Sequence, residues 1–326
     1  MKIKNLFLLA ALGLMASATL TSCEDVLGHW EKPTPNPITP PSGGETPVTP
    51  EEIIYAFSLR NMADDADVTA ALFKLTDQNG TEIAYATSDG KYTIKADDLS
   101  SVTTLWLEVT SDADKKYIAK ATVEELPAIA EAGKLKMATL GDVILSDGKF
   151  GVAGTAGQLA KIAYLGNDAE TNTDYNHGLA LALEDVSGTK AWCDQTSVTC
   201  LNAGHQYDSE AGAKGDMAGI DNTNMLKSYY VHDHDAASAA RGYNGGTHPD
   251  GTSEWFLPSA GQWNKMFTAA GGYANLKTNA SLNEEENYWS STECNAGVAW
   301  DFDSSDGTWY SNSKTYVDLV RACLAF

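Results

Sequence analysis

The chain has 326 residues, enough for two folded domains at roughly 150 residues each. Its composition of 43% hydrophobic, 9% aromatic and 20% charged residues is that of a globular protein, which excludes wholesale disorder, collagen and coiled coil. The formal net charge of −22 repels phosphate backbones, so we expect no nucleic-acid partner. No segment supplies the roughly 20 apolar residues that a membrane-spanning helix needs.

The first 22 residues have the pattern of a secretory signal peptide, with Lys2 and Lys4 followed by a short apolar run and then by small residues. The stretch Leu20-Thr21-Ser22-Cys23 resembles the lipobox of bacterial lipoproteins, in which the cysteine becomes the lipidated first residue. This resemblance implies that acyl chains on Cys23 anchor the protein to a membrane. The alternative is an ordinary signal peptide with a cysteine there by chance.

Residues 23–50 are predicted to form a stalk behind this anchor. Glu24 and Asp25 resemble a weak form of the acidic surface-export signal of Bacteroidetes lipoproteins, which implies the outer face of the outer membrane. Seven of the ten prolines lie in residues 31–50. Because proline locks its own φ angle and removes a hydrogen-bond donor, this stretch is predicted to be an extended, semi-rigid spacer.

Residues 51–126 are predicted to form a small β-sandwich of immunoglobulin-like type that serves as a spacer, because short strand-like segments alternate with turn signals. In residues 105–109 the odd positions are apolar, which is the alternation of a half-buried strand. The segment contains no histidine and no cysteine, so we expect neither a metal site nor a nucleophile in it. The predicted strands are Ile53–Leu59, Ala71–Leu75, Thr81–Ala86, Tyr92–Ile94, Thr104–Val109 and Tyr117–Val123.

Residues 134–326 hold most of the glycines and tryptophans and four of the five cysteines. Few helices are expected there. The clearest begins after Ser259, a good N-cap residue, and ends at Gly271-Gly272. One face of this helix carries Trp263, Met266, Phe267 and Ala270. A second helix is predicted over Asp235–Tyr243, with Asp235 as its cap, and short strands and long loops pinned by aromatic side chains are expected elsewhere.

Five segments of this region together resemble one group of proteins. They are Leu140–Gly148, His177–Leu183, Trp255–Gln262, Tyr288–Glu293 and Val320–Phe326. The combination is similar to that of gut Bacteroidales lipoproteins with a C-terminal C-type-lectin-like domain, a fold that formylglycine-generating-enzyme-like domains share. The group includes the variable proteins of diversity-generating retroelements. The resemblance implies an α+β fold in which residues 134–326 form a C-type-lectin-like ligand-binding domain.

The retroelement resemblance implies a diversified surface within residues 294–319. The randomised codons of such proteins typically become NNC, which cannot encode Met, Gln, Glu, Lys or Trp. Between Cys294 and Leu319 there is no Met, Gln or Glu, although a polar loop can lack them by chance. Lys314 is interpreted as an invariant position. The predicted ligand-binding residues are Asn295, Val298, Asp301, Asp303, Asp306, Thr308, Tyr310, Asn312, Thr315, Tyr316 and Asp318. The predicted structural frame is Trp289, Trp300, Trp309 and Arg321.

The composition of residues 294–319 suits binding however it arose, since Asn, Ser and Tyr recur in antibody paratopes. The tryptophans are expected to pack beneath this segment rather than to contact a ligand. We therefore predict a surface-tethered protein that binds an unknown macromolecular or glycan ligand. The alternative is a structural assembly subunit, for example a pilus-tip or accessory subunit, in which the C-terminal domain is only a cap.

No nucleophile, base and orienting group occur in a recognisable spacing, so we expect neither an enzyme nor a cofactor. His232-Asp233-His234-Asp235 is rich in metal-ligating residue types, but consecutive residues rarely all face one ion, and no metal site is predicted. Trp263-Asn264-Lys265 departs from the Trp-Asn-Asp calcium triplet of C-type lectins. Cys193 and Cys200 could form a disulfide outside the cell, with Cys294 and Cys323 as a second pair. Four cysteines allow three full pairings, which stay open.

Overall fold

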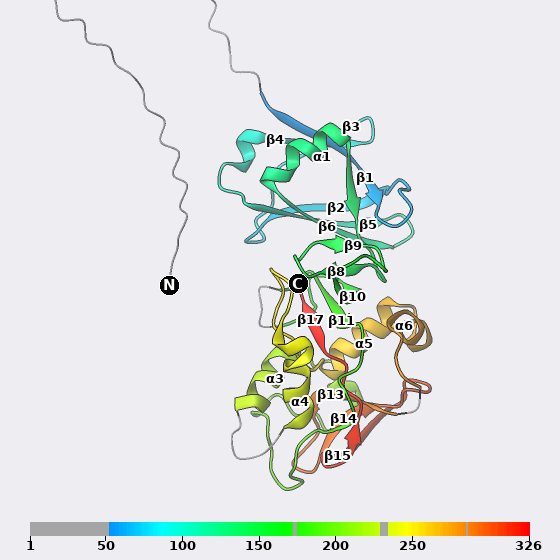
Figure 1. Cartoon of the computed structure of the whole chain (residues 1–326). Helices are drawn as coiled ribbons and strands as arrows, with labels where there is room; N and C mark the ends of the chain where they lie inside the picture. The colour runs from blue at the N-terminus through cyan, green and yellow to red at the C-terminus, as the bar shows by residue number, and fades with distance from the viewer. Residues whose placement is uncertain (1–51, 172–174, 229–233, 285) are drawn as a thin grey trace, which may run out of the picture. The chain divides into compact units, whose positions relative to one another are not determined.

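The computed structural model describes residues 52–171, 175–228, 234–284 and 286–326. The predicted signal peptide, Cys23 and the proline-rich stretch lie outside the described residues. The fold is mixed α+β, with more strand than helix (Figure 1). Residues 51–326 form one compact unit. Within the described ranges, no helix is both long and apolar enough to cross a membrane.

Two sheets make up the N-terminal part of this unit, from Ile54 to Met137. The first sheet has the strand order β3-β4-β1-β7, and the second has the order β2-β5-β6. Their strands are β1 (Ile54–Asn61), β2 (Ala70–Asp77), β3 (Ala86–Ser88), β4 (Lys91–Lys95), β5 (Thr104–Ser111), β6 (Lys116–Thr122) and β7 (Lys134–Met137). Both sheets contribute to one core, among others Phe57 from β1 and Leu75 from β2, so the sheets pack against each other.

Strand β5 is more deeply buried than the alternation in its sequence predicts. Leu105, Leu107 and Val109 belong to the core between the two sheets, as their apolar spacing predicts. Trp106, on the opposite face, is only 8% exposed and stacks on the ring of His177 with 4.1 Å between the centroids. Because His177 belongs to the C-terminal part of the unit, that part covers the face of β5 that the alternation assigns to solvent.

The strand predictions for this region agree with the structure except at two places. Of the predicted strand Thr81–Ala86, only Ala86 belongs to a strand, β3, while Glu82 forms an isolated bridge with Thr76. Strand β7, at the start of the predicted domain 134–326, was not predicted, and it pairs in parallel with β1 of the N-terminal part. A pairing between segments so far apart in the chain leaves no local sequence pattern, which is why the sequence did not indicate this strand.

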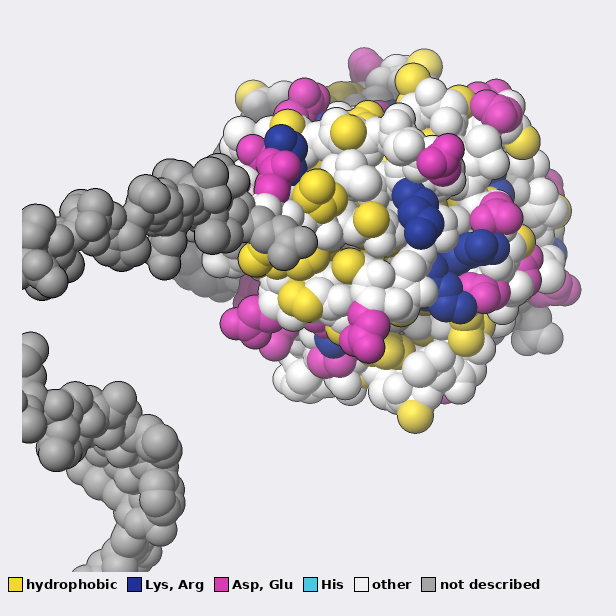
Figure 2. All heavy atoms as spheres, turned by 90° about the horizontal axis from the view of Figure 1, so that it is seen from above, with side chains coloured by type: hydrophobic (Ala, Val, Ile, Leu, Met, Phe, Trp, Pro, Cys, Tyr) yellow, Lys and Arg dark blue, Asp and Glu magenta, His cyan; other side chains and the backbone are white. Residues whose placement is uncertain are grey.

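One face of the unit is seen in Figure 2, where hydrophobic side chains lie scattered between acidic and basic ones. In the N-terminal part, the large hydrophobic side chains that are exposed are Ile53, Ile54, Leu72 and Tyr85. Apolar residues scattered singly over a surface are normal in soluble proteins and do not mark an interface.

Three further groups of strands form the C-terminal part. A central sheet has the order β17-β11-β10-β8-β9, a second sheet has the order β13-β14-β15, and β12 pairs with β16. Their strands are β8 (Val143–Leu145), β9 (Phe150–Gly151), β10 (Gln158–Leu165), β11 (Gly178–Ala182), β12 (Lys190–Ala191), β13 (Tyr288–Glu293), β14 (Val298–Phe302), β15 (Trp309–Ser313), β16 (Val317–Asp318) and β17 (Cys323–Ala325).

The central sheet has a hydrophobic core on each face. On β11, Leu179 and Leu181 belong to one core, while Ala180 and Ala182 belong to the other. A strand covered on both faces has a continuous apolar sequence instead of an alternating one, and the run from Leu179 to Ala182 has this form. The core that contains Ala180 also contains Trp106, so it joins the N-terminal and C-terminal parts.

The helices are α1 (Leu126–Ala132), α2 (Glu210–Ala213), α3 (Gly219–Ser228), α4 (Asp235–Arg241), α5 (Ala260–Ala269) and α6 (Tyr273–Ala280), with 3-10 turns η1 (Ala96–Leu99), η2 (Val123–Glu125) and η3 (Tyr243–Gly246). The prediction for α5 is confirmed: Ser259 and Gln262 form a reciprocal capping box, and Trp263 is buried. Helix α4 also exists, but its N-cap position is His234, so the prediction of Asp235 as cap is wrong by one residue.

Candidate ligand-binding surface

The segment predicted to bind a ligand follows β13 and forms β14, β15 and β16 with their turns. Strand β14 is central in its sheet and pairs antiparallel with β13 and β15, whereas β15 is an edge strand. Neighbouring residues of β14 alternate between the two faces. Phe302 packs on α5, with 4.9 Å between its ring centroid and that of Trp263. Asp301 points to the opposite face and is also buried, so β14 is covered on both sides.

The predicted frame residues are all buried: Trp289, Trp300, Trp309 and Arg321 are at most 7% exposed. The indole N–H of Trp289 donates to the carbonyl of Lys190 at 2.8 Å. Arg321 donates from Nε to Asp185 at 2.6 Å, and its other nitrogens donate to four backbone carbonyls. Because these donors have partners, the burial of Trp289 and Arg321 leaves none of them unpaired.

The predicted ligand-binding residues differ in exposure. The exposed ones are Asn295, Asp306, Thr308, Tyr310, Thr315 and Tyr316. The partly buried ones are Val298, Asp303 and Asn312. The buried ones are Asp301 and Asp318. Three further exposed residues of the segment were not among those predicted, namely Ser305, Ser311 and Val317.

The exposed residues lie along β15 and at both ends of the β14–β15 hairpin. Asn295 lies beyond one end, where Val298 pairs with Ser313. Thr308 lies in the turn at the other end, beyond the pair of Phe302 with Trp309. Strands rise about 3.4 Å per residue, so the paired region alone is roughly 15 Å long. A ligand that touches both ends at once must therefore be extended or macromolecular.

Asp301 and Asp318 do not belong to the exposed surface, which corrects the prediction for both. Asp301 accepts hydrogen bonds from the side-chain amides of Asn287 at 2.9 Å and Asn312 at 2.7 Å. Burial raises the pKa of both aspartates, and the charge of Asp301 raises that of Asp318 further, to about 7. Residue type alone did not reveal that Asp301 and Asp318 are buried, because loops from distant parts of the chain cover the face of β14 that carries Asp301. Through its hydrogen bond, Asp301 holds the side chain of Asn312, which lies on the same face of the hairpin.

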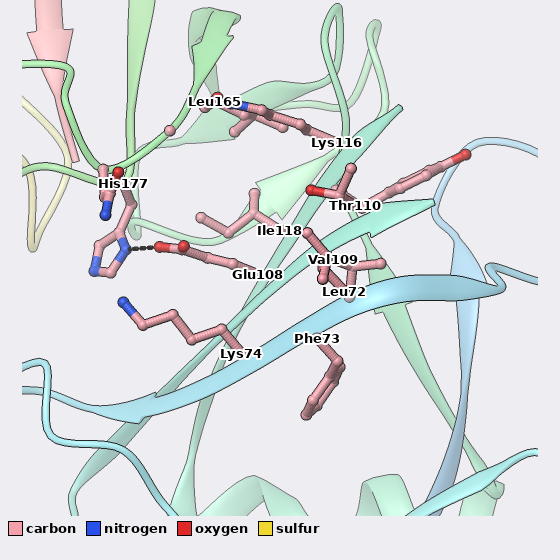
Figure 3. Close-up of a pocket in the computed structure, with 13 residues that line it drawn as sticks. Leu72, Phe73, Lys74, Glu108, Val109, Thr110, Lys116, Ile118, Leu165 and His177 are labelled. Carbon is pink, nitrogen blue, oxygen red and sulfur yellow. Dashed lines mark hydrogen bonds and ion pairs between the residues drawn. The ribbon is translucent and has the colours of Figure 1, made fainter. Parts of the chain in front are cut away.

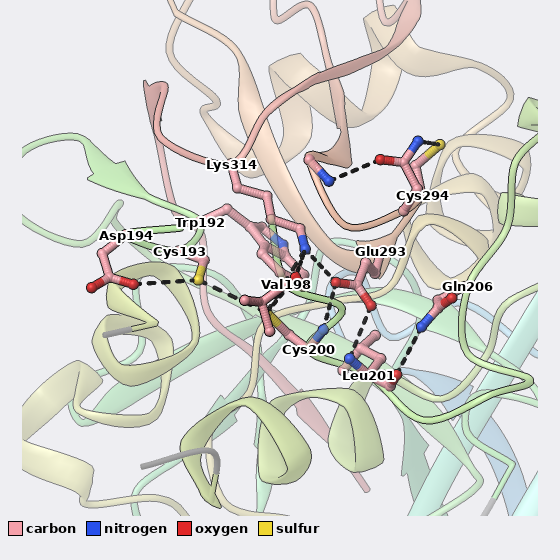
Figure 4. Close-up of polar contacts among 12 residues, drawn as sticks. Trp192, Cys193, Asp194, Val198, Cys200, Leu201, Gln206, Glu293, Cys294 and Lys314 are labelled. Atoms are coloured by element: carbon pink, nitrogen blue, oxygen red, sulfur yellow. Dashed lines mark hydrogen bonds and ion pairs between the residues drawn. The ribbon is translucent and has the colours of Figure 1, made fainter. Parts of the chain in front are cut away.

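A buried ion pair lies under the same hairpin (Figure 4). The side chains of Glu293 and Lys314 are both 0% exposed, and Lys314 Nζ bonds to Glu293 Oε1. Glu293 also accepts from the backbone N–H groups of Cys200 at 2.8 Å and Leu201 at 2.9 Å. Lys314 donates to the carbonyl of Val198 at 2.9 Å. The pair therefore ties the loop around residues 198–201 to the end of β13 and to the residue after β15, at the open end of the hairpin. Its one sequence signal is that Lys314 is the single lysine in residues 294–319.

A separate cavity of about 260 Å³ lies between β2, β5, β6 and the chain before β11 (Figure 3). Nδ1 of His177 lies 2.6 Å from Oε1 of Glu108, and Lys74 and Lys116 also line the cavity. Burial acts to raise the pKa of Glu108, but the hydrogen bond and charge interaction with His177 outweigh it, so this pKa is lowered. The Glu108–His177 contact links the two parts of the unit, and sequence reasoning missed it because the residues are 69 positions apart.

No protein-family model and no curated protein matches the chain. Among solved structures, the chain is similar to a fimbrial protein from Bacteroides ovatus ATCC 8483, with 15% sequence identity and a TM-score of 0.45. The likeness covers 84% of this chain and 71% of the other. A likeness at this level establishes neither a common fold nor a common function. The lipoprotein and retroelement resemblances of the sequence thus stay predictions.

Proposed function

We propose that the protein is a ligand-binding lipoprotein without enzymatic activity. A lipid on Cys23 tethers it to the outer surface of the outer membrane, and the proline-rich stalk and an immunoglobulin-like N-terminal part act as spacers. A C-type-lectin-like C-terminal domain then presents residues 295–317 to an extended macromolecular or glycan ligand. The alternative, a structural or pilus-tip subunit, uses the same tether and is separated from this proposal by the experiments below.

One observation carries the proposal: an exposed edge strand with its turns is held by buried side chains, among them Trp289, Arg321 and the Glu293–Lys314 pair, that bond to distant parts of the chain. Tyr310 and Tyr316 are 46% and 60% exposed, whereas Trp309, just before Tyr310, and Lys314, between the two tyrosines, are buried. A surface can accept many different side chains only if residues that do not vary hold its backbone. Tyrosine also supplies a large, rigid contact area at little entropic cost, which suits recognition.

The coding sequence from related strains tests the diversification. We expect amino-acid differences to concentrate at exposed positions such as Asn295, Thr308 and Tyr310, and to spare Trp309 and Lys314. A nearby reverse-transcriptase gene with a near-repeat of the terminal coding sequence would support the same conclusion. Differences spread evenly over residues 134–326, together with neighbouring pilin genes, would instead favour the assembly subunit.

Binding is tested with the purified chain on a glycan array and on whole host-cell surfaces. The double variant Tyr310→Ala/Tyr316→Ala is expected to lose most of the signal, because it removes the two most exposed aromatic side chains of the surface. Tyr85→Ala is the matched control, since Tyr85 is 42% exposed but belongs to the N-terminal part. Equal binding by the unaltered chain, the double variant and Tyr85→Ala would contradict the proposal that this surface binds the ligand.

Anchoring is tested separately with Cys23→Ala. We expect this variant to leave the membrane fraction or to accumulate unprocessed, and the unaltered protein to carry an acyl mass on Cys23. Unchanged fractionation without an acyl group would reject the lipid tether but would leave the binding surface untouched.

A further inference from the structure

Three residues from separate segments converge beside the buried ion pair. Cys193 follows β12, Cys200 lies seven residues later, and His234 is the N-cap residue of α4. Their ligand atoms all lie within 4.8 Å of one another, and all three residues are buried. Figure 4 shows the sulfurs of Cys193 and Cys200 facing each other. Two soft sulfur ligands and one imidazole are the donor set that zinc prefers in proteins.

The spacing of the two sulfurs fits one shared metal ion. Cys193 Sγ and Cys200 Sγ are 3.8 Å apart, and both thiols are free. A disulfide needs its sulfurs about 2.05 Å apart, so forming one here requires a movement of more than an ångström. Two thiolates that each lie about 2.3 Å from a tetrahedral zinc ion are about 3.8 Å apart, which is the spacing already present.

The surroundings hold these side chains in place. The backbone N–H of Cys193 donates to the carbonyl of Lys314 at 3.0 Å, and that of Cys200 donates to Glu293 at 2.8 Å. The ring of Trp192 meets that of His234 edge-on, with 6.2 Å between centroids. A site whose ligands are oriented by such contacts does not have to be assembled when the ion arrives.

The charges around Cys193, Cys200 and His234 also suit a bound divalent ion. Two thiolates and one neutral imidazole cancel the charge of a divalent ion, and Glu293 with Lys314 forms a neutral pair beside it. No net charge would therefore be buried, which avoids the large cost of an uncompensated ion. Lys314 Nζ lies 3.7 Å from Cys200 Sγ and can donate to a thiolate there. The exposed Asp194 has Oδ1 3.7 Å from Cys193 Sγ and is placed to reach a fourth coordination position.

We propose that Cys193, Cys200 and His234 bind one zinc ion. The ion fastens the loop between the two cysteines and the start of α4 to the base of the binding hairpin. Sequence reasoning set the histidine cluster aside because no suitably spaced partner accompanies it, whereas the structure supplies two cysteines 34 or more residues upstream. The site is independent of what the exposed surface binds.

The test uses the full chain, purified under reducing conditions, stripped with a chelator and titrated with Co²⁺ as a spectroscopic probe. We expect one equivalent to produce thiolate-to-cobalt charge-transfer absorption that Zn²⁺ then abolishes. Cys193→Ser is expected to remove this absorption, and His234→Ala to weaken Co²⁺ binding at least tenfold. Cys294→Ser is the matched control, because Cys294 is a buried thiol outside the cluster, and it should bind as the unaltered chain does.

Two results would overturn the proposal. One is the absence of charge-transfer absorption from the unaltered, folded chain, which does not depend on whether any variant folds. The other is a Cys193–Cys200 disulfide in nearly all of the protein isolated without reductant, detected by mass spectrometry of its peptides. Elemental analysis of that same material should otherwise find about one zinc per chain.

Discussion

Tyr310 and Asp301 lie opposite each other on β15 and β14, yet Tyr310 is 46% exposed and Asp301 is fully buried. As a cross-strand pair they share one face of the sheet, so their exposure differs because β15 is at the edge and β14 is central. We call the exposed residues of β15 and its turns the outer layer of the hairpin, and the buried residues that hold it the inner layer. The outer layer, on the edge strand and its turns, contributes contact surface. The inner layer bonds to distant parts of the chain, as Glu293 does to Cys200, 93 residues away. Affinity and stability are therefore expected to depend on different residues within the same short segment.

The largest effect is expected from breaking the buried ion pair. Lys314→Met leaves the charge of Glu293 buried without its partner, which should lower the free energy of unfolding by about 3–5 kcal/mol. The double variant Lys314→Met/Glu293→Gln should recover part of this loss, because it removes the uncompensated charge. Denaturant unfolding measures both variants.

The control for this comparison is Lys214→Met, which breaks the surface pair of Lys214 with Glu210. Exposed pairs of this kind contribute only about 0–1 kcal/mol, since water screens them. If Lys314→Met cost no more than Lys214→Met, the inner layer would not carry the stability assigned to it here.

A loss of similar or slightly smaller size is expected from Trp289→Ala. This substitution opens a cavity in the core and removes the hydrogen bond to Lys190, and such changes cost roughly 3–5 kcal/mol. Trp289→Phe should cost less, because most of the volume is kept. Thermal unfolding of both variants would show whether the frame is rigid or whether neighbouring side chains collapse into the space.

A pH-dependent effect of intermediate size should come from Asp318. Its pKa is raised from 3.8 to about 7 in the folded chain, so between these values the folded chain keeps a proton that the unfolded chain has released. Stability is therefore lost as pH rises through this window. We expect the free energy of unfolding to fall by more than about 1.4 kcal/mol, the equivalent of one pKa unit, from pH 5 to pH 8.

Asp318→Asn should flatten this pH dependence. Glu170, whose pKa is also raised to about 7 because it is buried, contributes with the same sign, so Glu170→Gln should flatten it as well. An unchanged slope in Asp318→Asn would show that this aspartate is not protonated in the folded chain.

The smallest effect on stability is expected in the outer layer. Thr308→Ala and Tyr316→Ala should each change the free energy of unfolding by no more than about 0.5 kcal/mol, as is usual for exposed sites. Their effect on ligand binding should be large by comparison. Losses of several kcal/mol would show that these side chains support the fold and would remove the distinction between the layers.

Sequence reasoning succeeded where the signal is local. Helix α5 could be placed because a capping residue, an apolar face and terminal glycines lie within a dozen residues of one another. Strand β5 could be placed because its apolar residues alternate. The same reasoning failed for the second face of β5 and for the start of α4, where neighbours from other segments decide the outcome.

In the candidate ligand-binding surface, too, local sequence pattern could not predict which residues are buried. Residues 294–319 could be singled out by composition, and the tryptophans of the frame could be expected to pack inside. Composition does not distinguish Asp306, which is exposed, from Asp301, which is buried, because both are aspartates in a polar segment.

By itself, the sequence indicated most strands of the N-terminal part, the helices α4 and α5, and the burial of the frame tryptophans, since these follow from local pattern and hydrophobicity. The tertiary structure alone decided which polar groups are buried and which residues they contact. Glu293 meets Lys314 and Cys200, and His234 meets Cys193, only because the fold brings loops from distant positions onto one face of β14. A buried polar group is stable only when such a partner reaches it, and that partner is a property of the folded chain.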